Sequence, residues 1–216
     1  SHAEAVVSKM EMLLGGRIEK LSPTDTWLLL HAAYAHDLGM VVQWSEIEDV
    51  WEQPEFKSYL DSLASSGEPE LREAAAFFRT AKDTETDQSW PLKAYRYVSL
   101  VNAAYFRGRH ARISKRYIEA DDRPFDLDFG HSGLIQPRLI KLLGRICTIH
   151  TEPLEKVLDL DYQTNGFDSD YAHPRFVAML LRLGDLLDID NGRFNTGVEL
   201  SFGSLPATSV PHKEKH

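Results

Sequence analysis

The chain has 216 residues, of which 43% are hydrophobic and 26% charged, with a formal net charge of −9. This composition is typical of an ordinary globular protein with one sizeable domain or two small ones. The acidic charge argues against broad nonspecific nucleic-acid binding, which depends on Lys and Arg neutralising phosphates. No apolar run approaches the ~20 residues of a membrane span, so we expect no membrane partner. The N-terminus has no secretion-signal pattern, and the single cysteine excludes an internal disulfide, so we expect a cytoplasmic location.

The apolar spacing predicts helices along almost the whole chain, and therefore an all-α fold. A first helix is expected over 3–14. A second is expected over 22–39, with Ser22 as N-cap, Pro23 at the first helical position and Gly39 as C-cap. This places His36 and Asp37 together in the last turn of a strongly apolar helix.

A third helix start is predicted at "SEIE" (45–48), which reads as a capping box. Residues 52–92 are polar and interrupted by proline, with "SSGEPE" and "KDTETDQSWP" expected as loops. A loop is also expected over 121–133. Further helices are predicted over 92–118, 134–150 and 175–190.

The domain prediction is one domain over 1–194, with about 43–92 as a helical and loop insertion. Residues 195–216 are predicted to be a tail. Strand-like alternation at Val198, Leu200 and Phe202 suggests a short β-hairpin near the C-terminus. Because the tail ends in polar residues without a closing element, we expect it to lead toward a further C-terminal part.

Imidazoles and carboxylates gather at the ends of these helices. The polar residues with the clearest chemical potential are His2, His36, Asp37, His110, His150 and Asp185. Neutral imidazoles and carboxylates together are the ligand set of a divalent transition metal. Helical proteins build such sites from ligands on the inner faces of several helices.

Each of these residues also has a structural interpretation. His36 and Asp37 could form an interior hydrogen-bonded pair, and His150 could be a helix C-terminal residue favoured by the macrodipole. Asp185 lies among leucines, where an unpaired carboxylate is rare, so its structural alternative is a salt bridge to Arg182 or Arg193. The same reading makes Asp188 a helix-end residue, paired with Arg193.

One basic concentration stands out in this acidic chain, "RGRHARISKR" over 107–116, which surrounds His110. The usual explanation of such a run is a solvated helix face. The functional interpretation is a phosphate clamp beside a metal. Arg109 and Arg112, three residues apart on one predicted helix face, are the candidates for binding the substrate phosphate.

These residues in this order resemble the HD superfamily of metal-dependent phosphohydrolases. That family has a histidine near the first helix, an adjacent His-Asp pair at the end of a later helix, and a distant aspartate. The pattern matches His2, then His36-Asp37 in "AHDLGM", then Asp185 in "LRLGDLLDID". His110 and His150 match the additional histidines that occur between the pair and the last aspartate in many members. The likeness spans residues 2–194.

The resemblance implies an HD-domain helical bundle with a central metal site. It implies one divalent ion, chosen from Mn, Fe, Ni, Mg and Zn, held by His2, His36, Asp37 and Asp185. A second ion often accompanies the histidines that His110 and His150 match. Alternatively, His110 remains metal-free and acts as a general acid toward the leaving group. Asp37 and His110 are therefore the candidate catalytic residues.

The implied function is hydrolysis of a phosphate mono- or diester of a nucleotide or nucleic acid by a metal-activated water. The sequence does not choose between a dNTP, a cyclic nucleotide, an alarmone and single-stranded nucleic acid, although the acidic charge favours a small nucleotide. "LSPTDTWLLLHAAYAHDLGM" and "RGRHARIS" look like a bacterial subgroup in which the HD domain precedes a Hsp90-like (GHKL) ATPase domain. The alternative function is therefore a regulatory or ligand-sensing domain, catalytically weak or inactive, coupled to an attached ATPase. A plain helical scaffold with accidental polar pairs is the third possibility.

Overall fold

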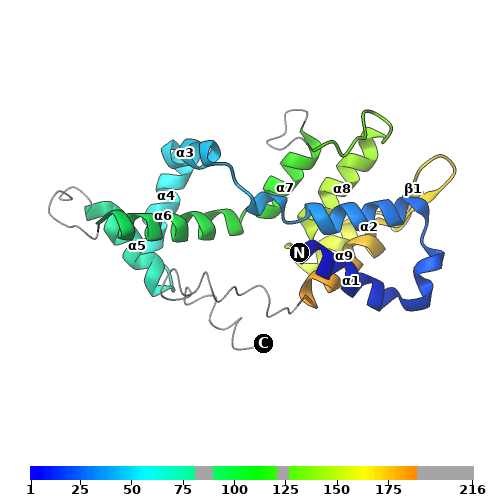
Figure 1. The fold of residues 1–216 in the computed structure, drawn as a ribbon, viewed down its shortest axis with the longest axis horizontal. Helices are drawn as coiled ribbons and strands as arrows, with labels where there is room; N and C mark the ends of the chain where they lie inside the picture. Colours follow the sequence, from blue (N-terminus) through cyan, green and yellow to red (C-terminus); the bar gives the residue numbers. More distant parts are fainter. Residues whose placement is uncertain (81–89, 121–126, 189–216) are drawn as a thin grey trace. The chain divides into compact units, whose positions relative to one another are not determined.

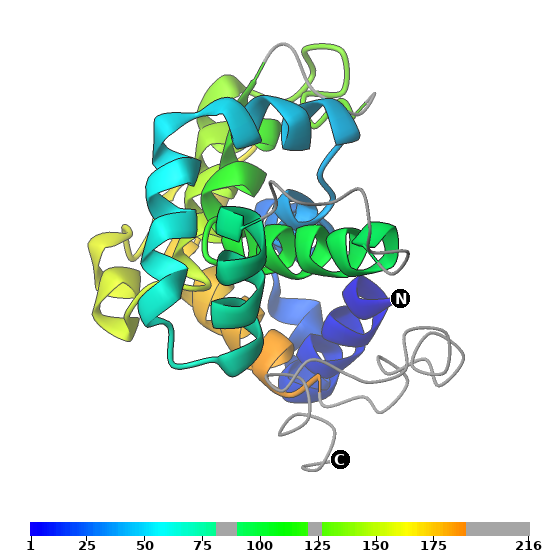
Figure 2. The same cartoon turned by 90° about the vertical axis from the view of Figure 1, so that its left-hand side faces the viewer.

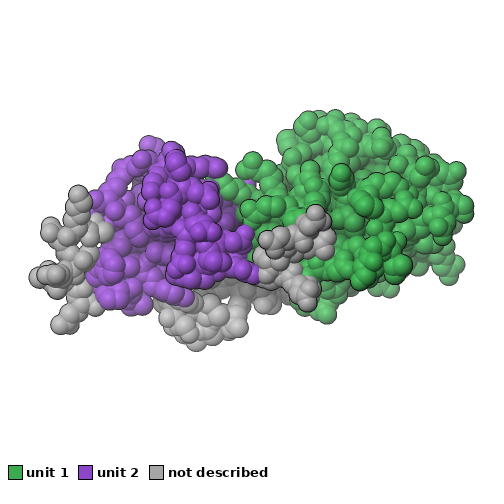
Figure 3. Space-filling model, turned by 90° about the horizontal axis from the view of Figure 1, so that it is seen from above, with its two compact units in different colours: residues 1–41, 109–189 green, residues 42–108, 190–216 purple. Residues whose placement is uncertain are grey.

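The computed structural model describes residues 1–80, 90–120 and 127–188 (Figure 1). The chain divides into two compact units, residues 1–41 with 109–189 and residues 42–108 with 190–216 (Figure 3). The second unit thus continues past residue 92, where the predicted insertion ends. The predicted tail over 195–216 and its strand-like alternation lie outside the described residues. None of the described helices combines the length and hydropathy that a membrane crossing requires.

The first unit is built from helices and one small sheet. Its α-helices are α1 (His2–Leu14), α2 (Pro23–Ala35), α7 (His110–Glu119), α8 (Pro137–Ile149) and α9 (Pro174–Leu186). Short 3-10 helices follow three of them, η1 (Gly15–Lys20), η2 (Leu38–Met40) and η4 (Leu154–Asp159). Strands β1 (Thr164–Asn165) and β2 (Tyr171–Ala172) pair antiparallel, with Thr164 opposite Ala172.

The core of this unit lies between α1, α2, α8 and α9. Figures 1 and 2 both show α1 lying along α9. The two helices approach closely at Gly184, where an added Cβ would lie 2.8 Å from Met10 Cγ and 3.1 Å from Val6 O. Val6, Leu28, Leu143 and Leu181 are fully buried in the same apolar cluster. The sequence prediction of an all-α bundle is confirmed for the described residues, and their short hairpin is formed by β1 and β2 rather than by the stretch around 198–202.

A polar network fixes the start of α2 against the start of α9. The buried carboxylate of Asp25 accepts hydrogen bonds from the backbone N–H and the ring Nδ1 of His173, each at 2.7 Å. Thr24 N donates to Asp170 Oδ2 at 2.9 Å. α2 and α9 each have 13 residues and pack against each other, with their first turns joined. The His-Asp pair after α2 and Asp185 in α9 are thereby brought close.

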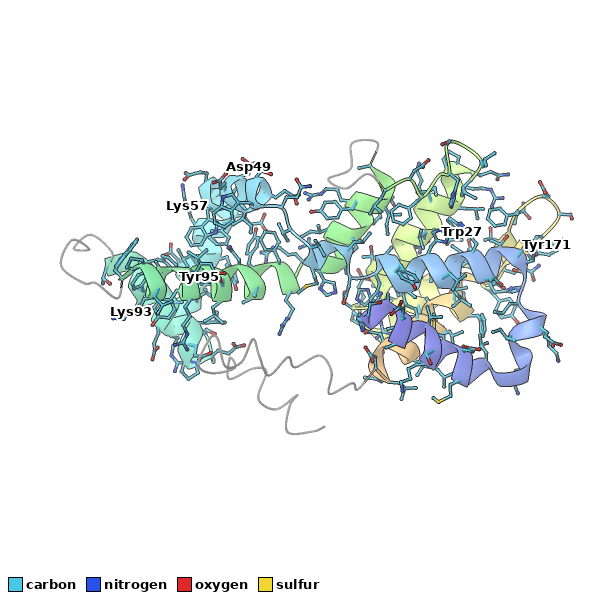
Figure 4. All side chains as sticks on the ribbon, viewed as in Figure 1. Trp27, Asp49, Lys57, Lys93, Tyr95 and Tyr171 are labelled. Carbon is cyan, nitrogen blue, oxygen red and sulfur yellow. The ribbon has the colours of Figure 1, made fainter. Side chains whose placement is uncertain are left out.

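The second unit contains α3 (Trp44–Glu52), α4 (Pro54–Ser62), η3 (Leu63–Ser65), α5 (Pro69–Thr80) and α6 (Trp90–Arg107). Aromatic rings fill its interior, with Phe56 packed against Trp51 at 4.8 Å and against Tyr105 at 4.9 Å between ring centroids. Trp51 Nε1 donates to Asn102 Oδ1 at 2.8 Å, which joins α3 to α6. Figure 4 shows Asp49, Lys57 and Tyr95 on α3, α4 and α6 of this unit.

Two predicted helix boundaries differ from the structure. α2 ends at Ala35 with His36 as its C-cap, so the prediction of Gly39 as C-cap is wrong. The helix predicted over 92–118 is two helices, because α6 ends at Arg107 and α7 begins at His110. Arg109 between them has φ −127° and ψ −10°, outside the α-helical region.

The polar stretch over 52–92 is more helical than predicted, since it contains α4 and α5. Both helices begin with proline at the first helical position, where proline starts a helix instead of marking the predicted loop. α3 begins two residues earlier than predicted, with Gln43 rather than Ser45 as N-cap and Glu46 completing the capping box.

Of the expected loop over 121–133, residues 127–133 form no helix, and 121–126 lie outside the described part of the chain.

Candidate metal centre

Five segments of the first unit bring imidazoles and carboxylates to one point, each from a helix end. The contributing residues are His2 at the start of α1, His36 at the end of α2, Asp37 just after it, His110 at the start of α7, His150 at the end of α8 and Asp185 in the last turn of α9. These are the six residues that the sequence predicted as metal ligands, and the structure brings all of them together. Three overlapping groups of three have ligand atoms within 4.8 Å of one another.

One side of the cluster faces the Oδ2 atom of Asp37. His2 Nε2 lies 3.6 Å from this oxygen, and His36 Nε2 lies 3.8 Å from it. Asp185 Oδ1 lies 3.3 Å from His2 Nε2 and 3.8 Å from His36 Nε2. The two imidazole Nε2 atoms are 3.2 Å apart. Two imidazoles and two carboxylates therefore converge on this side.

The other side of the cluster faces the Oδ1 atom of the same carboxylate. His110 Nε2 lies 3.2 Å from Asp37 Oδ1, and His150 Nε2 lies 3.7 Å from it. The two Nε2 atoms are 3.1 Å apart. Asp37 therefore stands between two groups of donors and offers one oxygen to each, an arrangement suited to two neighbouring ions.

The hydrogen bonds of three rings fix which nitrogen faces the cluster as a lone pair. His36 Nδ1 lies 3.0 Å from the Ala33 carbonyl oxygen, and His150 Nδ1 bonds to the Cys147 carbonyl oxygen. His2 Nδ1 lies 2.5 Å from Asp188 Oδ2. Since these oxygens only accept, each neutral ring carries its proton on Nδ1 and directs the Nε2 lone pair into the cluster.

This convergence fits a divalent cation. Lone pairs of His2 and His36 facing each other at 3.2 Å repel unless a cation or a proton lies between them. Ligand atoms held about 2.1 Å from one ion lie about 3 to 3.5 Å from one another, close to the separations found here. Imidazole nitrogens with carboxylate oxygens are the donor set of Mn, Fe, Ni or Zn.

Both carboxylates stay ionised, as metal ligation requires. Burial alone raises the pKa of Asp37, but the neighbouring imidazoles of His110 and His150 favour its charged form and hold the pKa well below its usual range. The pKa of Asp185 is lowered in the same way, with its burial outweighed by the neighbouring imidazoles of His2 and His36.

The cluster has a buried side, formed by histidines, and a partly exposed side, formed by the two carboxylates. The side chains of His36 and His150 are 1% and 3% exposed, whereas those of Asp37 and Asp185 are 39% and 33% exposed. On the buried side, burial raises the pKa of the Cys147 thiol, which therefore stays neutral and packs as an apolar side chain. Solvent therefore reaches the cluster from the side of the two carboxylates.

A tight contact between η2 and α7 holds the turn that carries Asp37. Ser114 Oγ donates to His36 O at 2.7 Å and accepts from Gly39 N at 2.8 Å. An added Cβ on Gly39 would lie 2.2 Å from His110 O and 2.8 Å from Ile113 Cβ. Gly39 is therefore required for close approach of the two backbones. Neither the close-approach role of Gly39 nor the contacts of Ser114 were predicted from the sequence.

His150 lies at the C-terminal end of α8, as its structural alternative expected, whereas the alternative for Asp185 does not describe its surroundings. Arg182, proposed as a partner of Asp185, instead donates to the carbonyl oxygens of Ile149 and Glu152 at 2.6 Å each and so caps the end of α8. The other proposed partner, Arg193, lies outside the described residues. Asp188, expected to be a helix-end residue, is 2% exposed and contacts the His2 ring. Its three-residue spacing from Asp185 was the signal available in the sequence.

The two predicted phosphate-binding arginines lie at the start of α7, Arg109 as its N-cap and Arg112 as its third residue. Arg109 is the N-cap of α7, outside the helix, and its Nε atom is buried. Arg112 lies two residues after His110, about 160° from it around the axis of α7. It lines a shallow surface pocket with Lys115, Arg116 and Glu119. Of the two, Arg109 is the one adjacent in the chain to a residue of the cluster.

Helix-end histidines and aspartates that converge in an all-α bundle define an HD-type domain. The HD-CE family model matches residues 1–216, and the chain belongs to this family. Searches of curated proteins and of solved structures gave no match. The link to a Hsp90-like ATPase domain stays a prediction.

Proposed function

We propose that the chain is a metal-dependent phosphohydrolase that cleaves a phosphate mono- or diester of a nucleotide. The observation that carries the proposal is the position of Asp37 between two donor groups, with one carboxylate oxygen toward each. Divalent ions in such a site supply Lewis-acid activation of water and of a phosphoryl oxygen. An accidental polar pair would not need four further ligand-type side chains directed at it from four other helix ends.

In this proposal Asp37 and the histidines around it have different roles. Asp37 stays ionised and offers one carboxylate oxygen to each of the two donor groups. The Oδ1 side, with His110 and His150, has three protein donors, one fewer than the Oδ2 side. It therefore leaves more room for substrate oxygens. His110 is 12% exposed and, where no ion occupies its side, can hold a proton at Nε2 for the leaving oxygen.

The proposed substrate class is inferred from the charge of Arg109 and from the net charge of the chain. Arg109, next to His110, is the candidate for neutralising the phosphate. The net charge of −9 disfavours a long polyanion and favours a small nucleotide, with single-stranded nucleic acid as the second candidate class. Action in the cytoplasm and an attached C-terminal ATPase domain belong to the same proposal.

A panel of phosphate esters tests the activity. The full chain with Mn²⁺ is incubated with dNTPs, cyclic nucleotides, a guanosine alarmone, short single-stranded oligonucleotides and chromogenic mono- and diesters. We expect product from at least one, lost with EDTA and in His36→Ala, and retained in His131→Ala. His131 is an exposed loop histidine outside the cluster, so it is the matched control. Nucleotide binding without product would contradict the proposal and favour a sensor domain.

A further inference from the structure

We propose that Asp188 is a positioning residue for the metal centre, because it sets the tautomer and orientation of His2. The inference rests on the proposed metal site but not on the hydrolysis of any ester. Asp188 Oδ2 lies 2.5 Å from His2 Nδ1, and the carboxylate side chain is 2% exposed. A buried carboxylate this close to an imidazole is a strong, water-excluded acceptor.

The end of α9 directs this carboxylate back toward the site. Leu187 N donates to Leu183 O at 3.0 Å, and Asp188 N donates to Asp185 O at 3.1 Å, so the backbone stays turned for one residue after the helix. Asp185 and Asp188 therefore reach the same imidazole from one stretch of chain. Asp185 Oδ1 lies 3.3 Å from His2 Nε2, while Asp188 holds the other nitrogen.

The contact at Nδ1 decides what His2 presents to the cluster. A carboxylate oxygen accepts, so a His2 ring bonded to it at Nδ1 carries its proton there and keeps the Nε2 lone pair for a metal. The opposite tautomer would point an N–H at the cluster and could not ligate. A carboxylate on the distal nitrogen of a ligating histidine also raises the basicity of the ligand.

Among the three rings whose Nδ1 contacts are described above, His2 is the one that depends on a side chain. His36 and His150 bond to backbone carbonyls of their own helices, which follow directly from helix formation. His2 is the first residue of α1 and is 22% exposed, so neither its helix nor its burial fixes the ring. Asp188 thus provides the hydrogen-bond acceptor at Nδ1 of His2, whereas backbone carbonyls provide it for His36 and His150.

The test compares Asp188→Asn with the parent and with Asp161→Asn, an exposed carboxylate of the same unit. Metal affinity is measured by titration with Mn²⁺, following free Mn²⁺ by electron paramagnetic resonance. The tautomer of His2 is measured on metal-free protein by ¹⁵N NMR of the ring nitrogens. We expect a 10- to 100-fold weaker Mn²⁺ affinity in Asp188→Asn and partial transfer of the His2 proton to Nε2. Asp161→Asn is expected to change neither.

Two results would overturn the proposal: an unchanged Mn²⁺ affinity, or a weaker affinity with the His2 proton still wholly on Nδ1. If Asp188→Asn does not fold, Asp188→Glu takes its place, because it keeps an acceptor at Nδ1. It should retain the parental tautomer and bind Mn²⁺ within tenfold of the parent, and a lost tautomer there would also contradict the inference. A parent that binds Mn²⁺ but hydrolyses no ester would refute the phosphohydrolase proposal and leave this one standing.

Discussion

Replacing Asp37 by asparagine is expected to lower the hydrolysis rate by at least about a thousand-fold, which corresponds to about 4 kcal/mol of lost transition-state stabilisation. The carboxylate gives one oxygen to the His2 and His36 side and the other to the His110 and His150 side. An amide of the same shape gives one oxygen, and its NH₂ group faces the other donors and cannot ligate.

The measurement is the turnover rate of Asp37→Asn at saturating Mn²⁺, on whichever ester the parent cleaves. Asp159→Asn is the matched control, since Asp159 is an exposed carboxylate that pairs with Lys156 at 2.9 Å. We expect parental turnover in the control. Retention of more than a tenth of the parental rate in Asp37→Asn would show that the shared carboxylate is not the centre of the reaction.

The second large effect is expected from Gly39→Ala, which should lower the free energy of unfolding by about 3 kcal/mol. The new methyl group would lie 2.2 Å from the backbone oxygen of His110. A backbone oxygen at a helix start cannot move aside as the end of a flexible side chain can. η2 must therefore separate from α7, which also disturbs the Ser114 contacts beside Asp37.

Denaturant unfolding in the presence of a chelator, followed by far-ultraviolet circular dichroism, measures this effect without a metal contribution. Gly16→Ala is the control, because no atom lies within 4 Å of the Cβ it would add. The control is expected to change stability by less than about 1 kcal/mol. Equal stabilities of the two variants would mean that the close approach of η2 to α7 is not needed for folding.

Much of the helical fold was predictable because local signals and the final structure agree. Ser22 and Pro23 start α2 as predicted, and the apolar periods of 134–150 and 175–190 become α8 and α9. The break between α6 and α7 was missed, since a single glycine such as Gly108 inside a helical pattern does not by itself predict a helix end. That break makes Arg109 the N-cap of α7 rather than a residue inside a longer helix.

The candidate site was predictable as a set of residues but not as a geometry. Helix-end histidines and aspartates suggested ligands, and the family resemblance ordered them along the chain. The two-sided use of Asp37 depends on packing between α7, α8 and η2, which no local pattern encodes. Asp188 was missed because its partner, His2, lies 186 residues away in the sequence.

The central claim is that residues far apart in the sequence form one metal site, and the metal content of the purified chain tests it most directly. Elemental mass spectrometry on the parent, Asp37→Ala and Asp185→Ala, each prepared without chelator and supplied with Mn, Fe or Ni, gives the number of ions per chain. We predict about one or two ions in the parent and a loss in both variants, with Asp37→Ala losing more because its carboxylate faces both donor groups. A parent without metal, or two variants that keep the parental content, would contradict the account.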